Sequence, residues 1–258
     1  MNTIITEIQG KVGIIRLNRP EAMNCVNEKM AEEFALAMGE MEHNDDINII
    51  ILTGMGKAFC AGGDIKAMQE FATAAEAMNY VQKVGNITHL IYHCRKPVIA
   101  MVNGAAAGAG FNIALACDLI IAAANCKFIQ SFVNVGLAPD CGGHYLLPKA
   151  VGSHLAKQFM FEAAPVTAEQ GKELGFVNKI FPTDTLEQET LQYAKMLSEK
   201  APLAMQVCKN ILNNSEGMTL EDMLEVEAKS QSLLAMTDDC KEGLAAFTEK
   251  RQPIFRGE

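Results

Sequence analysis

The chain has 258 residues and carries 22 Lys and Arg against 31 Asp and Glu, a formal net charge of −9 at pH 7. A content of 49% hydrophobic and 21% charged residues excludes a disordered chain, and the length suits one large domain or one domain with an appendage. The acidic balance excludes a general nucleic-acid binder, which needs clustered Lys and Arg to neutralise phosphates. No apolar run reaches the ~20 residues of a membrane span.

The N-terminal segment lacks the basic region and apolar run of a signal peptide, so we expect a cytoplasmic protein. Eight cysteines are spread along the chain among apolar neighbours and form no CxxC pair. This pattern is typical of reduced, mostly buried thiols in a cytosolic protein. The five histidines show no metal-ligand spacing with the cysteines, so we expect no metal site.

Strands and helices alternate in the first half of the chain. Runs rich in β-branched residues at 4–8 and 12–17 predict an opening hairpin, and apolar residues at three- and four-residue spacing predict an amphipathic helix from Asn27. Continuous apolar runs at 47–52, 98–102 and 119–123 predict buried, parallel strands. The intervening segments predict helices over 65–94 and 111–116.

The pattern changes near residue 150, after which it is helical. The predicted helices span 152–161, 167–174, 186–200, 202–213, 220–235 and 241–250. Thr167 with Gln170, and Thr219 with Asp222, have the spacing of capping boxes. We therefore predict an α/β core over 1–185 and a helical region over 186–258, which packs on the core or on a partner subunit.

Three glycine-rich segments, 57–64, 103–110 and 138–143, are candidate functional turns. Each of the first two follows a predicted strand and precedes a predicted helix, where unpaired backbone N–H groups meet the positive end of a helix dipole. Two such turns facing each other would hold a developing oxyanion. Close packing of backbone against backbone is the alternative. Dinucleotide binding is disfavoured, because the order of glycines after Gly104 is not G-x-G-x-x-G.

Several motifs together resemble the enoyl-CoA hydratase/isomerase (crotonase) superfamily over nearly the whole chain. They are Arg19-Pro-Glu-Ala-Met-Asn24, the stretch 56–66, Pro97-Val-Ile-Ala-Met-Val-Asn-Gly104, Ala116-Cys-Asp118 and the tail 242–250. The resemblance implies a spiral of ββα units with a helical C-terminal trimerisation region. It also implies homotrimers or homohexamers (dimers of trimers), an acyl-CoA thioester substrate of fatty acid metabolism, and no cofactor beyond the coenzyme A of the substrate.

Carried over residue by residue, the resemblance assigns the two oxyanion-hole donors to the backbone N–H groups of Gly63 and Ala109. It assigns contacts with coenzyme A to the following residues: Ala22, Met23, Gly63, Asp64, Ile65, Lys66, Phe247 and Lys250. The two lysines supply local positive charge for phosphates in an acidic chain. Either lysine alone is also compatible with an ordinary solvated surface charge.

Two departures from the hydratase pattern bear on the reaction. Hydratases of this type carry glutamates where this chain has Asn112 and Phe132. Addition of water needs a base for the water and an acid for the carbon, so ordinary two-glutamate hydration is disfavoured. One acid remains in the region, Asp140, which is also placed to cap the helix that follows it. This pattern most resembles the single-aspartate enoyl-CoA isomerases, such as 1,2-epoxyphenylacetyl-CoA isomerases.

The resemblance thus implies a 3-enoyl-CoA to 2-enoyl-CoA isomerase, with Asp140 moving the proton and Gly63 and Ala109 stabilising the thioester enolate. The alternatives are a hydratase, a dehalogenase or a ring-opening epoxide isomerase on the same fold, or a non-catalytic CoA-binding subunit. His89, His93 and Tyr145 lie near the predicted site, and we interpret them as structural.

Overall fold

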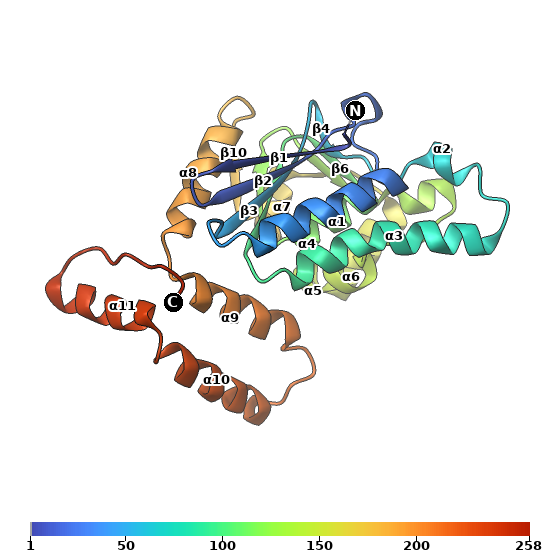
Figure 1. The fold of residues 1–258 in the computed structure, drawn as a ribbon. Coiled ribbons are helices and arrows are strands. Elements are labelled where there is room, and N and C mark those ends of the chain that lie inside the picture. The colour runs from blue at the N-terminus through green and yellow to red at the C-terminus, as the bar shows by residue number, and fades with distance from the viewer. Residues whose placement is uncertain (1) are drawn as a thin grey trace.

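A six-stranded sheet forms the centre of the computed structural model, which describes residues 2–258 (Figure 1). The strands lie in the order β1-β2-β3-β5-β7-β10. β1 and β2 form the predicted hairpin, which turns at Gly10 with φ 59°, and all later neighbours in this sheet are parallel. The bounds are β1 (Ile4–Gln9), β2 (Val12–Leu17), β3 (Ile49–Gly54), β5 (Val98–Val102), β7 (Leu119–Ala123) and β10 (Lys179–Phe181).

A second, four-stranded sheet has the order β4-β6-β8-β9. Its strands are β4 (Ala58–Cys60), β6 (Ala105–Ala107), β8 (Lys127–Ile129) and β9 (Val166–Thr167). Three times the chain passes from a strand of the large sheet to a strand of the small sheet and then to a helix or helical turn: β3-β4-α2, β5-β6-α4 and β7-β8-η2. This repetition is the predicted spiral of ββα units, which is confirmed.

Helices surround the sheets (Figure 1), except for α4, which is buried in the core. They are α1 (Glu28–His43), α2 (Ile65–Met68), α3 (Ala74–His93), α4 (Ala109–Ala116), α5 (Gly143–Val151), α6 (Ser153–Glu162) and α7 (Ala168–Glu173), with 3-10 turns η1 (Pro20–Ala22) and η2 (Ser131–Val135). The prediction of one helix over 65–94 is wrong. The chain leaves the helix after α2, and Thr73 begins α3 afresh by accepting a hydrogen bond from the Glu76 N–H.

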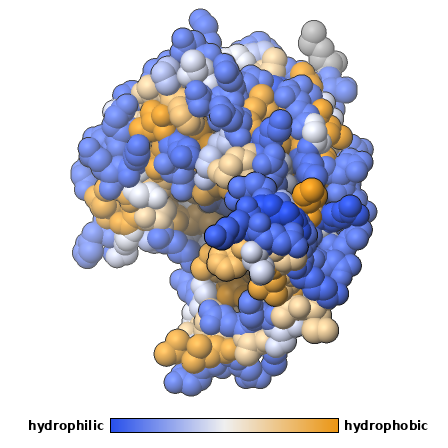
Figure 2. Space-filling model, turned by 90° about the vertical axis from the view of Figure 1, so that its left-hand side faces the viewer, coloured by the Kyte–Doolittle hydropathy of each residue, from blue (hydrophilic) through white to orange (hydrophobic). Residues whose placement is uncertain are grey.

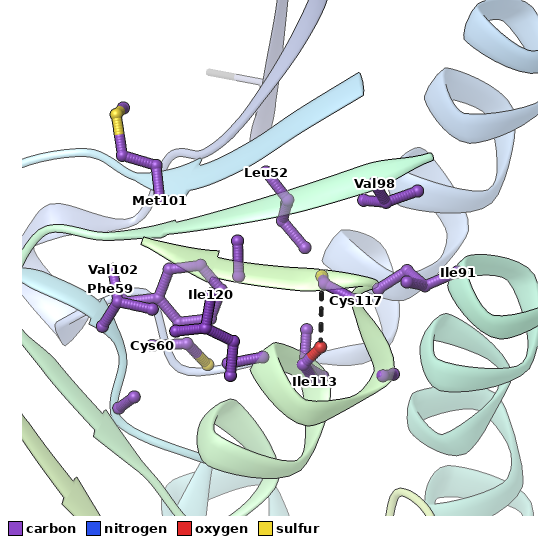
Figure 3. Close-up of a cluster of buried hydrophobic side chains, with 14 of the residues drawn as sticks. Leu52, Phe59, Cys60, Ile91, Val98, Met101, Val102, Ile113, Cys117 and Ile120 are labelled. Carbon is purple, nitrogen blue, oxygen red and sulfur yellow. Dashed lines mark hydrogen bonds between the residues drawn. The ribbon is translucent and has the colours of Figure 1, made fainter. Parts of the chain in front are cut away.

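The core lies between the large sheet and the helices that pack on it. Figure 3 shows part of it, with side chains from β3, β5 and β7 meeting those of α3 and α4. β3 is buried along its whole length, as expected for a strand covered on both faces. All eight cysteines are free thiols, and five of them are buried, in agreement with the prediction.

The C-terminal helices are α8 (Leu186–Ser198), α9 (Pro202–Asn214), α10 (Leu220–Leu234) and α11 (Asp238–Glu249). α8 packs on the large sheet through Leu186 and Ala194, whereas α9–α11 extend from the body as an arm (Figure 1). The predicted region 186–258 therefore contains one helix of the body and three of the arm. Both predicted capping boxes, at Thr167 and Thr219, are confirmed.

Candidate active site

The first donor turn follows β4 and contains Gly63. Val26 donates its N–H to the Gly62 carbonyl, and Asp64 donates its N–H to the Val26 carbonyl. These two hydrogen bonds fix the backbone on both sides of Gly63. The hydroxyl of the buried Tyr80 donates to the Val26 carbonyl (2.6 Å) and accepts from the Asp64 N–H (2.9 Å). Within residues 2–258 the Gly63 N–H donates no hydrogen bond, so a fixed, unused donor is present here.

The second donor turn joins β6 to α4. Gly108 has φ 52°, which a glycine adopts without strain, and its N–H donates to Ile129 at the end of β8. Ala109 is the first residue of α4, and its N–H has no acceptor among the described residues. A Cβ built on Gly62 would lie 3.9 Å from the Ala109 nitrogen, so the two turns are neighbours. The predicted donors are thus brought together.

Close packing accounts for other glycines of the same segments. A Cβ on Gly104 would collide with the Lys57 carbonyl oxygen, and one on Gly110 with the Cys60 carbonyl oxygen. The alternative from the sequence is therefore correct for these two positions. The absence of side chains at these two glycines allows the segment that contains α4 to approach β4 closely enough for the two donor turns to meet.

Asp140 lies in the loop between η2 and α5. α5 is capped by Gly142 without a side-chain hydrogen bond, so the alternative that Asp140 caps this helix with its side chain is wrong. Asp140 Oδ1 is buried without a hydrogen-bond partner among the described residues. Burial raises the pKa of this carboxyl above its ordinary value of 3.8, and a hydrogen bond with the Cys141 thiol opposes the rise.

The charge of Asp140 reaches both side chains behind the first donor turn. Burial raises the pKa of Cys60 and of Tyr80 to about 12, and the Asp140 carboxylate adds to both increases. A Cβ on Gly63 would lie 3.4 Å from the Tyr80 hydroxyl. Asp140 is therefore electrostatically coupled to the turn that holds Gly63.

The two positions at which related hydratases carry glutamates hold no acid. Asn112 is fully buried in α4, one turn after Ala109. Phe132 is buried in η2, with its ring 3.5 Å from the position of a Cβ on Gly108. The second donor turn is thus covered by an aromatic ring and followed by an amide.

The residues predicted to contact coenzyme A near the N-terminus lie beside the first donor turn. The Met23 carbonyl accepts the Ala61 N–H, and the Met23 side chain is exposed. Asp64 caps α2 and forms an ion pair with Arg19 at 2.8 Å. The other three predicted residues, Ala22, Ile65 and Lys66, range from half-buried to exposed.

Phe247 and Lys250 lie elsewhere. Phe247 is in α11, Lys250 caps its C-terminus, and both are exposed. Figure 1 shows α11 on the opposite side of the molecule from α2. The structure therefore does not bring these two residues to the Gly63 turn of their own chain.

His89, His93 and Tyr145 are on the surface. The two imidazole rings are tilted by 36° with their centroids 4.2 Å apart, and Lys149 lies over the Tyr145 ring at 3.8 Å. Across residues 2–258, no cluster of three or more His, Cys, Asp or Glu side chains is arranged to hold a metal ion. None of the helices in this part of the chain is long and apolar enough to cross a membrane.

Comparison with known proteins agrees with this geometry. The model of the family described as enoyl-CoA hydratase/isomerase matches residues 7–258. The chain belongs to the enoyl-CoA hydratase/isomerase family. It is 34% identical to 1,2-epoxyphenylacetyl-CoA isomerase of Escherichia coli K12 (100% of this chain, 99% of that one). It is also 34% identical to short-chain-enoyl-CoA hydratase of Clostridium acetobutylicum (98% and 97%).

A solved enoyl-CoA hydratase from Polaromonas sp. JS666 superposes on this member of the family with a TM-score of 0.95. The two chains are 33% identical, and the match covers 98% of this chain and 99% of that one. Acyl-CoA chemistry of the hydratase/isomerase type is therefore supported. The relatives include proteins named as isomerases and proteins named as hydratases.

Two parts of the site are not predicted by the sequence. Tyr80 lies within a predicted helix, and its role depends on contact with Val26, 54 residues away. Asn112 shows in the sequence only that a glutamate is absent, whereas its role depends on the hydrogen bonds it makes. Both depend on long-range contacts that local spacing does not encode.

Proposed function

We propose that this enzyme is an acyl-CoA isomerase that moves a double bond from the 3,4 to the 2,3 position of an enoyl-CoA thioester. The observation that carries the proposal is that, of positions 112, 132 and 140, only position 140 holds an acid. Asp140 is half-buried, and one of its carboxyl oxygens, Oδ1, is buried without a hydrogen-bond partner among the described residues. Asn112 and Phe132, both buried, occupy the other two positions. One carboxyl suffices for a 1,3 proton shift, whereas hydration requires separate acid and base functions.

In the proposed reaction, the Asp140 carboxylate removes a proton from the α carbon. The C–H electrons then form a dienolate, whose negative oxygen accepts hydrogen bonds from the Gly63 and Ala109 N–H groups. The same carboxyl returns the proton to the γ carbon, the dienolate collapses to the thioester, and the double bond lies between the α and β carbons. No atom is gained or lost, and no cofactor is needed beyond the coenzyme A of the substrate.

The raised pKa of Asp140 suits this role. A carboxylate whose charge is disfavoured by burial is a stronger base than one in water, and its acid form is a competent donor in the second step. Phe132 contributes by excluding water from the second donor turn, which protects the dienolate. We further propose that coenzyme A lies along Ala22–Met23 and Asp64–Lys66. The cytoplasmic location remains a prediction from the sequence.

The test measures turnover of 3-enoyl-CoA, 2-enoyl-CoA and ring-epoxide CoA thioesters by the wild type and by Asp140→Asn. General acid–base assistance is typically ~10²–10⁴-fold, so 3-enoyl-CoA isomerisation should fall by that factor in Asp140→Asn, with little change in affinity. Asp46→Asn, at an exposed site, is the control and should behave as wild type. Preferred turnover of 2-enoyl-CoA by addition of water would instead identify a hydratase.

A further inference from the structure

α4 carries a polar side chain that the proposed reaction does not use. Asn112 is completely buried, and its Nδ2 donates to the Asp140 carbonyl oxygen at 2.8 Å. Its Oδ1 accepts from Nε2 of Gln130 at 2.7 Å. Gln130 is also buried and directly follows β8. Two side-chain amides in series therefore connect β8, α4 and the Asp140 loop.

This connection needs an amide at position 112. Asn112 donates to one neighbour and accepts from the other, which an ionised carboxylate cannot do because it only accepts. The fit is close, since a Cβ on Gly143 would collide with the Asn112 amide. Asn112, at the position where related hydratases carry a glutamate, thus donates a hydrogen bond to the Asp140 carbonyl that an ionised glutamate could not donate.

The Asp140 loop is held at two successive carbonyls. The Asp140 carbonyl accepts from Asn112 and from the Gly143 N–H (2.9 Å), and the Cys141 carbonyl accepts from the Thr88 hydroxyl (3.0 Å). Cys141 has φ 48°, a left-handed conformation that a non-glycine residue keeps only when its surroundings impose it. The loop conformation therefore depends on these external hydrogen bonds.

α4 also begins with Ala109, the second oxyanion donor, three residues before Asn112. We propose that Asn112, oriented by Gln130, is a positioning residue that fixes Asp140 relative to the oxyanion donor of the same helix. The inference rests on the proposed role of Asp140 as acid and base. In this proposal, the first turn of α4 sets the distance between the Asp140 carboxyl, which moves the proton, and the Ala109 N–H, which stabilises the enolate.

The test uses Asn112→Asp, which keeps the size of the side chain and replaces the amide donor to Asp140 by a carboxyl, which only accepts when it is ionised. Turnover of 3-enoyl-CoA is normalised to the number of sites that bind butyryl-CoA, so that loss of folded protein does not count as loss of rate. A small displacement of a catalytic group can cost ~10²-fold in rate, so we expect kcat per site to fall roughly 10- to 100-fold. KM and the affinity for butyryl-CoA should remain near wild type.

Asn48→Asp is the matched control. Asn48 also donates through Nδ2 to a backbone carbonyl, that of Ser198, but it lies at the amino end of β3, away from the donor turns. Its kcat per site should remain unchanged. Gln130→Leu removes only the second amide and should lower kcat in the same direction with KM unchanged. It provides the measurement should Asn112→Asp fail to fold.

Normal kcat per site in Asn112→Asp, or in Gln130→Leu should the first variant not fold, would overturn the positioning role. The proposed function fails by a different result, which is normal isomerisation by Asp140→Asn. The two failures are therefore distinguishable. An inactive Asp140→Asn together with a normal Asn112→Asp would leave the isomerase intact and remove only this inference.

Discussion

Asp140 is in surroundings that favour its neutral form, and this has a consequence for folding. Burial raises the pKa of the carboxyl above its ordinary value of 3.8. The native state therefore holds the proton more tightly than the unfolded chain does. The stabilisation from this protonated group is complete below pH 3.8 and is lost as the pH rises through the native pKa. At neutral pH, ionisation of Asp140 therefore lowers the free energy of unfolding.

Asp140→Asn should consequently raise the free energy of unfolding at pH 7 while it lowers activity. Each pKa unit of the native increase corresponds to ~1.4 kcal/mol, because asparagine cannot ionise. Denaturant unfolding of both proteins at pH 7 and near pH 3.8 measures the effect, and the difference should shrink at the lower pH. A variant less stable than wild type at pH 7 would contradict this account.

The same increase in pKa sets the acidic limit of activity. The base form of Asp140 is populated only above its native pKa, so kcat/KM should fall on acidification with a midpoint above 3.8. The profile is measured with 3-enoyl-CoA, and circular dichroism at each pH verifies that the protein remains folded. A midpoint at or below 3.8 would show that Asp140 titrates as an exposed carboxyl.

At the scale of single residues, the sequence shows which groups are present and the fold determines what they do. Asp140 could be selected from the sequence because it is the one acid in its turn. Its environment could not be predicted, because the side chains that hold its loop by hydrogen bonds come from α3 and α4. The bond from Asn112 to Asp140 joins positions 28 residues apart, and no local pattern encodes it.

At the scale of secondary-structure elements, one buried ion pair joins the arm to the body. Lys209 of α9 donates to the carboxylate of Asp118 at 2.7 Å and to the carbonyls of Ile91 and Lys96 at 3.1 Å each. Burial raises the pKa of Asp118, and the Lys209 charge opposes the rise. α9 is therefore anchored where β5, β7 and the end of α3 meet.

Lys209→Met should destabilise the protein by about 3 kcal/mol, because it leaves the Asp118 charge buried without its partner. The double variant Lys209→Met/Asp118→Asn should recover part of this loss, since it removes the remaining charge. Lys241→Met breaks an ion pair with Asp238 at the surface and is the control, with little expected change. Thermal unfolding compares the four proteins. Equal loss in the Lys209 and Lys241 variants would show that the buried pair contributes no more than a surface pair.

The long elements could be predicted from hydrophobic periodicity, and the short ones could not. β3, β5 and β7 are continuous apolar runs, α1 starts from its N-cap Asn27 as predicted, and α8–α10 match their predicted ranges closely. The strands of the second sheet have three residues or fewer, too short for a period of two to be visible. The break between α2 and α3 is not visible in the sequence, because apolar residues continue across it. These missed elements carry both donor turns, so the site was less predictable than the core.

At the scale of the whole molecule, the arm exposes apolar surface that the chain itself does not cover. Phe247 is 86% exposed and Leu233 is 74% exposed, and further apolar side chains on α9–α11 are exposed with them. Figure 2 shows apolar surface on the arm and in the notch between arm and body. A hollow of about 400 Å³ lined by Leu203, Val207 and Val226 lies between α9 and α10. Such surface is unusual on a monomer.

We propose that a second copy of the chain covers this surface, in a trimer or a dimer of trimers. An arm that projects from its own body can pack on the body of a neighbour. Phe247 and Lys250, which lie far from the Gly63 turn of their own chain, could then reach the site of another copy. This arrangement would reconcile their predicted contact with coenzyme A with their position in Figure 1.

Sedimentation at micromolar concentration tests the assembly. The wild type should sediment at three or six times the 28.0 kDa of one chain. Leu224→Asp combined with Leu233→Asp places charges at two exposed apolar positions of α10 and should shift the protein to smaller species, because burying an unpaired charge is costly. Leu36→Asp, at a 71% exposed position of α1, is the control and should leave the assembly intact. A wild-type protein that stays monomeric at this concentration would show that the arm covers no second copy.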